Sequence, residues 1–169
     1  YFSDNLKKAF SHTLNMFLLF QKRPAIKKEK LYSYISILNN LCFMLFNRKQ
    51  YSSIPKFLDE FRALESLKQP ESVKIRLFFF HKYALLNFMN GLGQFTEAES
   101  QLPEIIMQIK QYENKLNQFD KVILFGNIAI VYFGIRQYNK SIFWLNKIRN
   151  EITGDILPDI ESFLILFFL

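Results

Sequence analysis

Few side chains in this sequence are of the types that carry out catalytic or metal chemistry. The two histidines, His12 and His81, lie far apart, and neither has a Cys, Asp or Glu at metal-ligand spacing. Because His81 stands between Phe80 and Tyr83 on a strongly apolar segment, the pattern favours a hydrogen-bonded core or groove histidine over a general base. The sequence therefore predicts neither a metal site nor a cofactor.

The single cysteine and two acidic pairs have simple structural interpretations. Cys42 cannot form a disulfide within the chain, and its apolar surroundings favour a small packing residue, although a thiolate nucleophile stays open. The pairs Asp59-Glu60 and Glu97 with Glu99 stand beside Lys or Arg, which predicts solvated helix faces with local ion pairs.

The segment Gly91-Leu92-Gly93 could suggest a phosphate-binding loop. It lies between two helical patterns with no strand before it, so the sequence predicts a helix end and a turn. With no nucleotide loop, serine hydrolase motif or paired-carboxylate arrangement, the chain is predicted not to be an enzyme.

Composition favours an all-α domain over residues 1–169. The 169 residues include 20 Phe and 8 Tyr but 5 Gly and 5 Pro, which supplies large rings for burial and little material for frequent turns. No apolar run is long enough to span a bilayer, and the given sequence does not open on a signal-peptide pattern, so we expect a cytoplasmic protein without a membrane anchor. Because the chain starts at Tyr1, we also expect a fragment of a longer protein.

Positive charge is concentrated at the N-terminus. Residues 1–30 carry seven Lys or Arg against two acids, a net +5, and residues 31–169 carry fifteen against thirteen, a net +2. Such a stretch is typical of a solvated helix face, and it could also bind phosphates, with Tyr32 and Tyr34 stacking on bases. The candidate nucleic-acid residues are Lys22, Arg23, Lys27, Lys28 and Lys30.

Three segments align without gaps: residues 47–54, 91–98 and 134–141. Each contains Asn or Gly, two variable residues, Gln, an aromatic residue and a small polar residue, and the aromatic anchors Tyr51, Phe95 and Tyr138 lie 44 and 43 positions apart. Apolar residues on both sides recur at helical spacing, which predicts a helical hairpin around each anchor. The predicted repeats are residues 31–68, 73–112 and 120–152, with a truncated helix at 159–169. A partial repeat at 1–22 is ended by the segment 21–30, which contains Pro24.

The third repeat carries a family resemblance. Its residues Phe125, Ile128, Ala129, Tyr132, Tyr138, Ser141, Leu145 and Ile148 resemble the alternating large, small and aromatic positions of the tetratricopeptide repeat. The period exceeds the usual length of about 34 residues, as in bacterial proteins with longer units of this type. The resemblance implies antiparallel helical hairpins stacked as a right-handed α-solenoid.

The resemblance also implies a binding groove on the concave wall of the solenoid, lined by the first helix of each repeat. Its positions map to Ser36, Asn39, Asn40, Phe43, Phe80, Tyr83, Asn87, Asn90, Ile123, Asn127 and Ile130. Amides and rings suit an extended peptide or a helix, so we expect a non-catalytic protein-interaction scaffold. Two alternatives remain: the amides tie helices together and the rings are core, or the basic N-terminal stretch binds nucleic acid.

The final segment, Phe163 to Leu169, is entirely apolar. Exposed, it would form an aggregation-prone patch, so we expect further C-terminal helices or a homodimer partner to cover it. A membrane anchor is disfavoured because seven helical residues span about 10 Å, a third of the hydrocarbon thickness.

Overall fold

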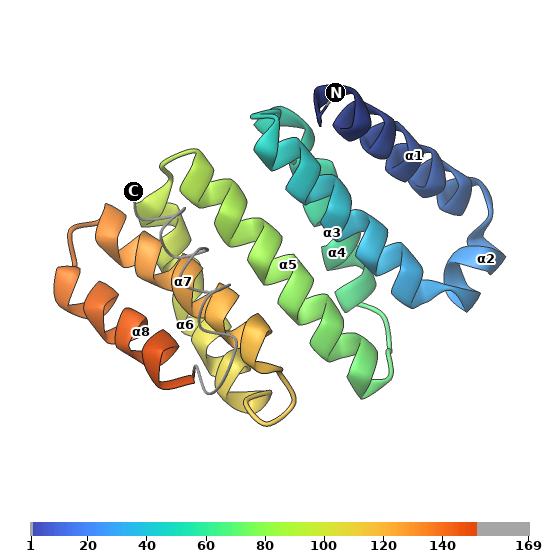
Figure 1. Cartoon of the computed structure of the whole chain (residues 1–169). Coiled ribbons are helices and arrows are strands. Elements are labelled where there is room, and N and C mark those ends of the chain that lie inside the picture. Colours follow the sequence, from blue (N-terminus) through green and yellow to red (C-terminus); the bar gives the residue numbers. More distant parts are fainter. Residues whose placement is uncertain (1, 152–169) are drawn as a thin grey trace. The chain divides into compact units, whose positions relative to one another are not determined.

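The computed structural model describes residues 2–151, which are helical with short turns and contain no strand. This confirms the predicted all-α class. None of these helices is both long enough and apolar enough to cross a bilayer. The helices are α1 (Phe2–Lys22), α2 (Pro24–Glu29), α3 (Leu31–Asn47), α4 (Pro55–Glu65), α5 (Glu71–Gly91), α6 (Phe95–Gln111), α7 (Gln118–Gly134) and α8 (Tyr138–Glu151), with a 3₁₀ turn η1 (Tyr51–Ser53) before α4 (Figure 1). The predicted helix at 159–169 and the segment Phe163 to Leu169 lie outside the described residues.

The chain divides into two compact parts, Tyr1–Phe88 and Met89–Leu169. In the N-terminal part, α3 contacts α1, α2 and α4. Its buried residues recur every three or four positions, which places them on one stripe of the helix: Tyr34, Ile35, Leu38, Leu41, Cys42 and Leu45. Phe57 and Phe61 of α4 are buried as well, and Phe17 of α1 meets the Phe57 ring edge-on at 5.2 Å between centroids. Phe17 also stacks on Tyr34 of α3, with 6.1 Å between centroids, so aromatic packing joins α1, α3 and α4.

The segment 21–30 contains the end of one helix and a second, short helix. Helix α1 continues to Lys22, and Pro24 begins the separate helix α2, which ends at Glu29. A proline in the first helical turn costs little, because the N–H group that it lacks would have no partner within the helix.

In the C-terminal part, α7 contacts both α6 and α8. The Phe125 ring of α7 packs against Trp144 of α8, with 5.1 Å between centroids. Between the same helices, the Ser141 hydroxyl donates a 2.9 Å hydrogen bond to the carbonyl oxygen of Ala129. Ala129 is fully buried and Ser141 nearly so, which is consistent with small residues allowing a close approach of the two helices.

The three aligned segments form the same helix-ending turn. The backbone N–H groups of Gln50, Gln94 and Gln137 each donate to the carbonyl five residues earlier, at 2.9, 2.9 and 2.8 Å. The preceding residues adopt positive φ angles: 56° at Lys49, 69° at Gly93 and 63° at Arg136. This hydrogen-bond pattern is the Schellman motif, in which one left-handed residue closes the helix. The segment Gly91-Leu92-Gly93 is thus a helix end, as predicted.

Candidate functional site

Four predicted groove residues meet within the N-terminal part. Asn39 and Phe43 of α3 and Tyr83 and Asn87 of α5 line a cavity of about 10 Å³, together with Cys42, Phe46, Ile54, Ala84 and Phe88. A cavity of this size holds about one water molecule. We call the four residues Asn39, Phe43, Tyr83 and Asn87 the amide–aromatic cluster.

The polar groups of the cluster are unequally satisfied. The Oδ1 atom of Asn39 is buried and accepts no hydrogen bond from the described residues. Burial raises the pKa of the Tyr83 phenol, and the hydrogen bond with Asn87 opposes that rise only in part, so the phenol keeps its proton at neutral pH. Asn39 is therefore the member of the cluster whose buried acceptor is unpaired among the described residues.

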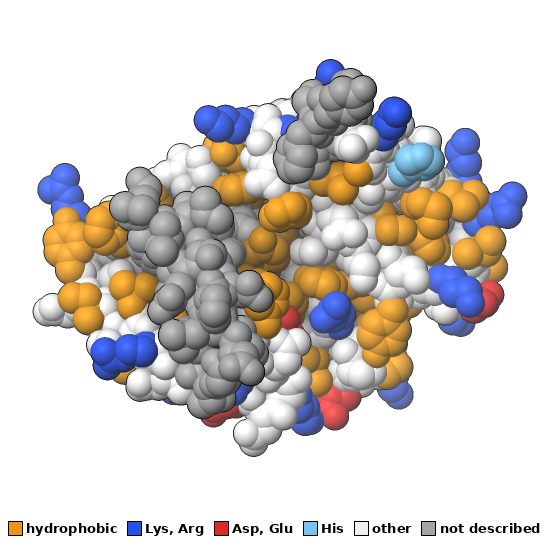
Figure 2. Space-filling view, in the orientation of Figure 1, with side chains coloured by type: hydrophobic (Ala, Val, Ile, Leu, Met, Phe, Trp, Pro, Cys, Tyr) orange, Lys and Arg blue, Asp and Glu red, His pale blue; other side chains and the backbone are white. Residues whose placement is uncertain are grey.

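The outer edge of the cluster is exposed. Phe43 is 50% exposed, although it is a large apolar side chain. Asn40 is exposed and Ser36 half-buried on the same helix, and residues at spacings of three, four and seven share one helix face. Figure 2 shows hydrophobic side chains at the surface over α1 and α3. This edge offers apolar contact beside an unused hydrogen-bond acceptor.

In the C-terminal part the predicted groove amides bind each other. Asn127 is 2% exposed; its Nδ2 donates to the carbonyl oxygen of Ile123 at 3.0 Å, and its Oδ1 accepts from Asn90 Nδ2 at 3.2 Å. Ile123 is buried and Ile130 half-buried. These amides tie the end of α5 to α7, which is the alternative that the sequence left open.

Two further aromatic positions belong to the core. Phe80 is 8% exposed, and the Arg76 guanidinium lies 4.3 Å from its ring centroid. His81 is 2% exposed, its Nδ1 lies 2.8 Å from the carboxylate of Glu65, and its ring stacks on Phe61. The prediction of a hydrogen-bonded core histidine is confirmed.

Cys42 is a packing residue, as its sequence environment predicted. The side chain is 4% exposed, and burial raises the pKa of its thiol to about 12. A thiol with this pKa carries almost no thiolate at neutral pH, so it is a poor nucleophile. Within residues 2–151, His, Cys, Asp and Glu side chains form no group of three that could hold a metal ion.

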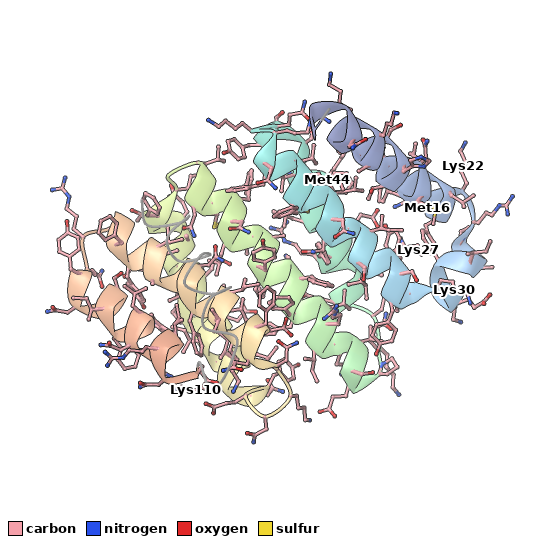
Figure 3. All side chains as sticks on the ribbon, in the orientation of Figure 1. Met16, Lys22, Lys27, Lys30, Met44 and Lys110 are labelled. Atoms are coloured by element: carbon pink, nitrogen blue, oxygen red, sulfur yellow. The ribbon has the colours of Figure 1, made fainter. Side chains whose placement is uncertain are left out.

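The basic N-terminal stretch is partly neutralised. Lys27 Nζ lies 3.0 Å from Glu60 and 4.2 Å from the ring centroid of Tyr34, and Lys30 pairs with Glu29 at 2.9 Å. Figure 3 shows where three of these lysines lie: Lys22 ends α1, Lys27 is in α2, and Lys30 lies between α2 and α3.

Two predictions about this region are wrong. Tyr34 is fully buried and donates to Glu60, so it cannot stack on bases as expected. Glu60 is likewise half-buried with a partner 33 residues away, which differs from the predicted solvated face with local pairs.

A larger cavity, which sequence reasoning missed, adjoins this basic stretch. Its volume is about 730 Å³, and it lies where α2, the start of α3, the end of α4 and the start of α5 meet. We call it the lysine-rimmed groove; its lining residues are Pro24, Lys27, Lys28, Glu29, Leu31, Tyr32, Leu64, Leu67, Lys68, Gln69, Pro70 and Val73. No sequence pattern links residues 24–32 to residues 64–73, because only tertiary packing brings them together.

Comparison with known proteins does not identify a family for this chain. No protein-family model matches the chain, and neither a curated protein nor a solved structure shows significant similarity to it.

Proposed function

We propose that this chain is a non-catalytic interaction module that binds an extended peptide or a helix of another protein at the amide–aromatic cluster. One observation carries the proposal: the half-exposed ring of Phe43 lies beside Asn39, whose buried carbonyl oxygen has no hydrogen-bond partner among the described residues. An unpaired buried acceptor is costly, and a ligand that donates to it removes that cost.

Protein ligands supply the complementary chemistry. An extended peptide presents backbone N–H groups along its length, and the first turn of a helix has N–H groups without internal partners. Either could donate to Asn39 while an apolar side chain covers the Phe43 ring. Aromatic anchors that become buried when a partner binds carry much of the affinity of protein interfaces.

We also propose a tetratricopeptide-like solenoid as the scaffold that presents the cluster. The three identical turns after α3, α5 and α7 support a repeating hairpin, because the same backbone hydrogen bonds recur at Gln50, Gln94 and Gln137. A cytoplasmic location agrees with the single buried thiol of Cys42, which leaves no internal disulfide to form.

Nucleic-acid binding by the basic stretch is the weaker proposal. Two of its five basic residues, Lys27 and Lys30, already pair with carboxylates, which leaves Lys22, Arg23 and Lys28 for phosphates. Phosphate binding weakens steeply with salt as counterions are released, whereas an apolar contact at Phe43 tolerates salt.

A peptide selection tests the proposal. Peptides are selected from a random display library on the purified chain at high salt, and the affinity of the best peptide is measured for the parent chain and for Phe43→Ala and Asn39→Ala. We expect Phe43→Ala to weaken binding about tenfold or more. The matched control is Phe119→Ala, which removes a ring that is 54% exposed in the C-terminal part. Equal affinities for Phe43→Ala and Phe119→Ala would contradict the proposal.

A further inference from the structure

The lysine-rimmed groove has the size and walls of a small-molecule site. Its volume of about 730 Å³ lies within the range of known ligand pockets, which is about 300–1,000 Å³. Leu64 and Val73 are buried in its wall, whereas Leu67 is 55% exposed. Two prolines and Leu31 add further apolar surface. Such a wall suits an alkyl chain.

The charges on the groove are not balanced. Among its four charged residues, Lys27 lies 3.0 Å from Glu60 and Glu29 lies 2.9 Å from Lys30. The other two, Lys28 on α2 and Lys68 after α4, have no ion-pair partner among the described residues. Two unpaired ammonium groups at the rim of an apolar groove are complementary to one anionic head group.

The groove is held in shape by hydrogen bonds, two of which are made by its lining residues Lys27 and Tyr32. Lys27 and Tyr34 both bind the Glu60 carboxylate, which ties α2 and α3 to α4. On another side of the groove, the Tyr32 phenol of α3 donates a 2.6 Å hydrogen bond to Ser72 in the first turn of α5. A site that is already shaped loses less entropy when a ligand binds.

We propose that the lysine-rimmed groove binds a single-chain anionic amphiphile, with its carboxylate or phosphate head on Lys28 and Lys68 and its alkyl chain along Leu64, Leu67 and Val73. Among the described residues, the groove has two unpaired cations and one lining ring, Tyr32, beside its aliphatic residues. This favours the amphiphile over nucleic acid, which needs several unpaired cations along a strand and several rings for stacking. The site shares no residue with the amide–aromatic cluster and is independent of it.

The ligand class is tested by calorimetric titration of the full chain with monomeric alkyl carboxylates below their micelle concentration. We expect affinity to rise about two- to fourfold per added methylene from octanoate to dodecanoate. We expect dodecyl phosphate to bind as well. The head group of the tighter-binding compound, carboxylate or phosphate, then identifies the class of head group that the groove prefers. Dodecyltrimethylammonium, which has the same chain and the opposite charge, is expected not to bind.

The location is tested by two double variants that remove the same net charge. Lys28→Ala with Lys68→Ala is expected to weaken dodecanoate binding about tenfold or more. Lys22→Ala with Arg23→Ala, which lie outside the groove lining, is expected to change it less than about twofold. Leu67→Ser, at an exposed position, is expected to weaken binding about fivefold with an unchanged circular dichroism spectrum.

Three results would overturn the proposal. These are equal losses in the two double variants, an affinity that does not depend on chain length, and tighter binding of a single-stranded oligonucleotide that the Lys28 and Lys68 substitutions abolish.

Discussion

The phenol of Tyr34 donates a 2.6 Å hydrogen bond to the carboxylate of Glu60, which joins α3 to α4. Lys27 of α2 donates to the same carboxylate at 3.0 Å, and Gln21 of α1 donates to the Tyr34 oxygen at 2.8 Å. Four consecutive helices therefore meet at one fully buried ring and one half-buried carboxylate. The network fixes α2 at the edge of the lysine-rimmed groove.

Removing the Tyr34 hydroxyl tests how much this network stabilises the fold. We expect Tyr34→Phe to lower the free energy of unfolding by about 1–2 kcal/mol, because Glu60 and Gln21 each lose a partner away from bulk water. Urea unfolding followed by circular dichroism measures the change. Tyr32→Phe is the control: its hydrogen bond to Ser72 is exposed, and we expect a change below about 0.5 kcal/mol. An equal effect of the two substitutions would contradict this account.

The Glu60 carboxylate gives the stability a pH dependence of defined sign. Burial raises its pKa, but hydrogen bonds from Tyr34 and Lys27 and the charge of Lys27 outweigh burial and hold the pKa below its usual range. A folded-state pKa below the unfolded one contributes stability above the unfolded pKa that is lost as pH falls. The stability advantage of the parent chain over Glu60→Gln is therefore expected to shrink between about pH 5 and pH 3. A difference that stays constant over this range would contradict the prediction.

The Cys42 thiol is expected to be inert in the folded chain. Burial raises its pKa to about 12, so both access and thiolate content are low at pH values near 8. Ellman's reagent should leave the folded chain unmodified and titrate one thiol in guanidinium chloride. Rapid reaction without denaturant would show that the α3 packing around Cys42 opens readily.

The positive φ angles in the recurring turns predict that glycine stabilises the fold there, although it destabilises a helix. Arg136 has a φ of 63°, so we expect Arg136→Gly to raise the free energy of unfolding by about 0.5–1 kcal/mol. Conversely, Gly93→Ala, at a φ of 69°, should lower it by about 1 kcal/mol. Arg149→Gly is the matched control, because it places glycine at an exposed position in α8 and should destabilise by about 1 kcal/mol. Stabilities are compared by thermal unfolding, and destabilisation by Arg136→Gly would contradict the account.

Local patterns in the sequence were sufficient to predict the long helices and the aligned turns. The spacing of Leu38, Leu41 and Leu45 marks one buried stripe of α3, and the aligned Gln and aromatic residues mark the helix ends. Helix α2 was missed because Pro24 was interpreted as a break, although proline is favoured in a first turn.

The candidate sites required information that periodicity does not contain. A helical period places Asn39 and Asn127 on helix faces, but it does not show whether another side chain forms hydrogen bonds with their amide groups. The structure shows that Asn90 does so for Asn127, whereas the Asn39 oxygen has no partner among the described residues. Similarly, Lys28 and Lys68 line one groove only because α2 packs beside the end of α4.

The most direct test of the proposed function is an NMR titration of the ¹⁵N-labelled chain with the selected peptide. The account predicts that the side-chain amide signals of Asn39 and Asn87 and the backbone signal of Phe43 shift most, while those of Asn127 stay in place. Shifts confined to α2 and the basic residues around it, or spread over the chain without a maximum at the amide–aromatic cluster, would contradict it.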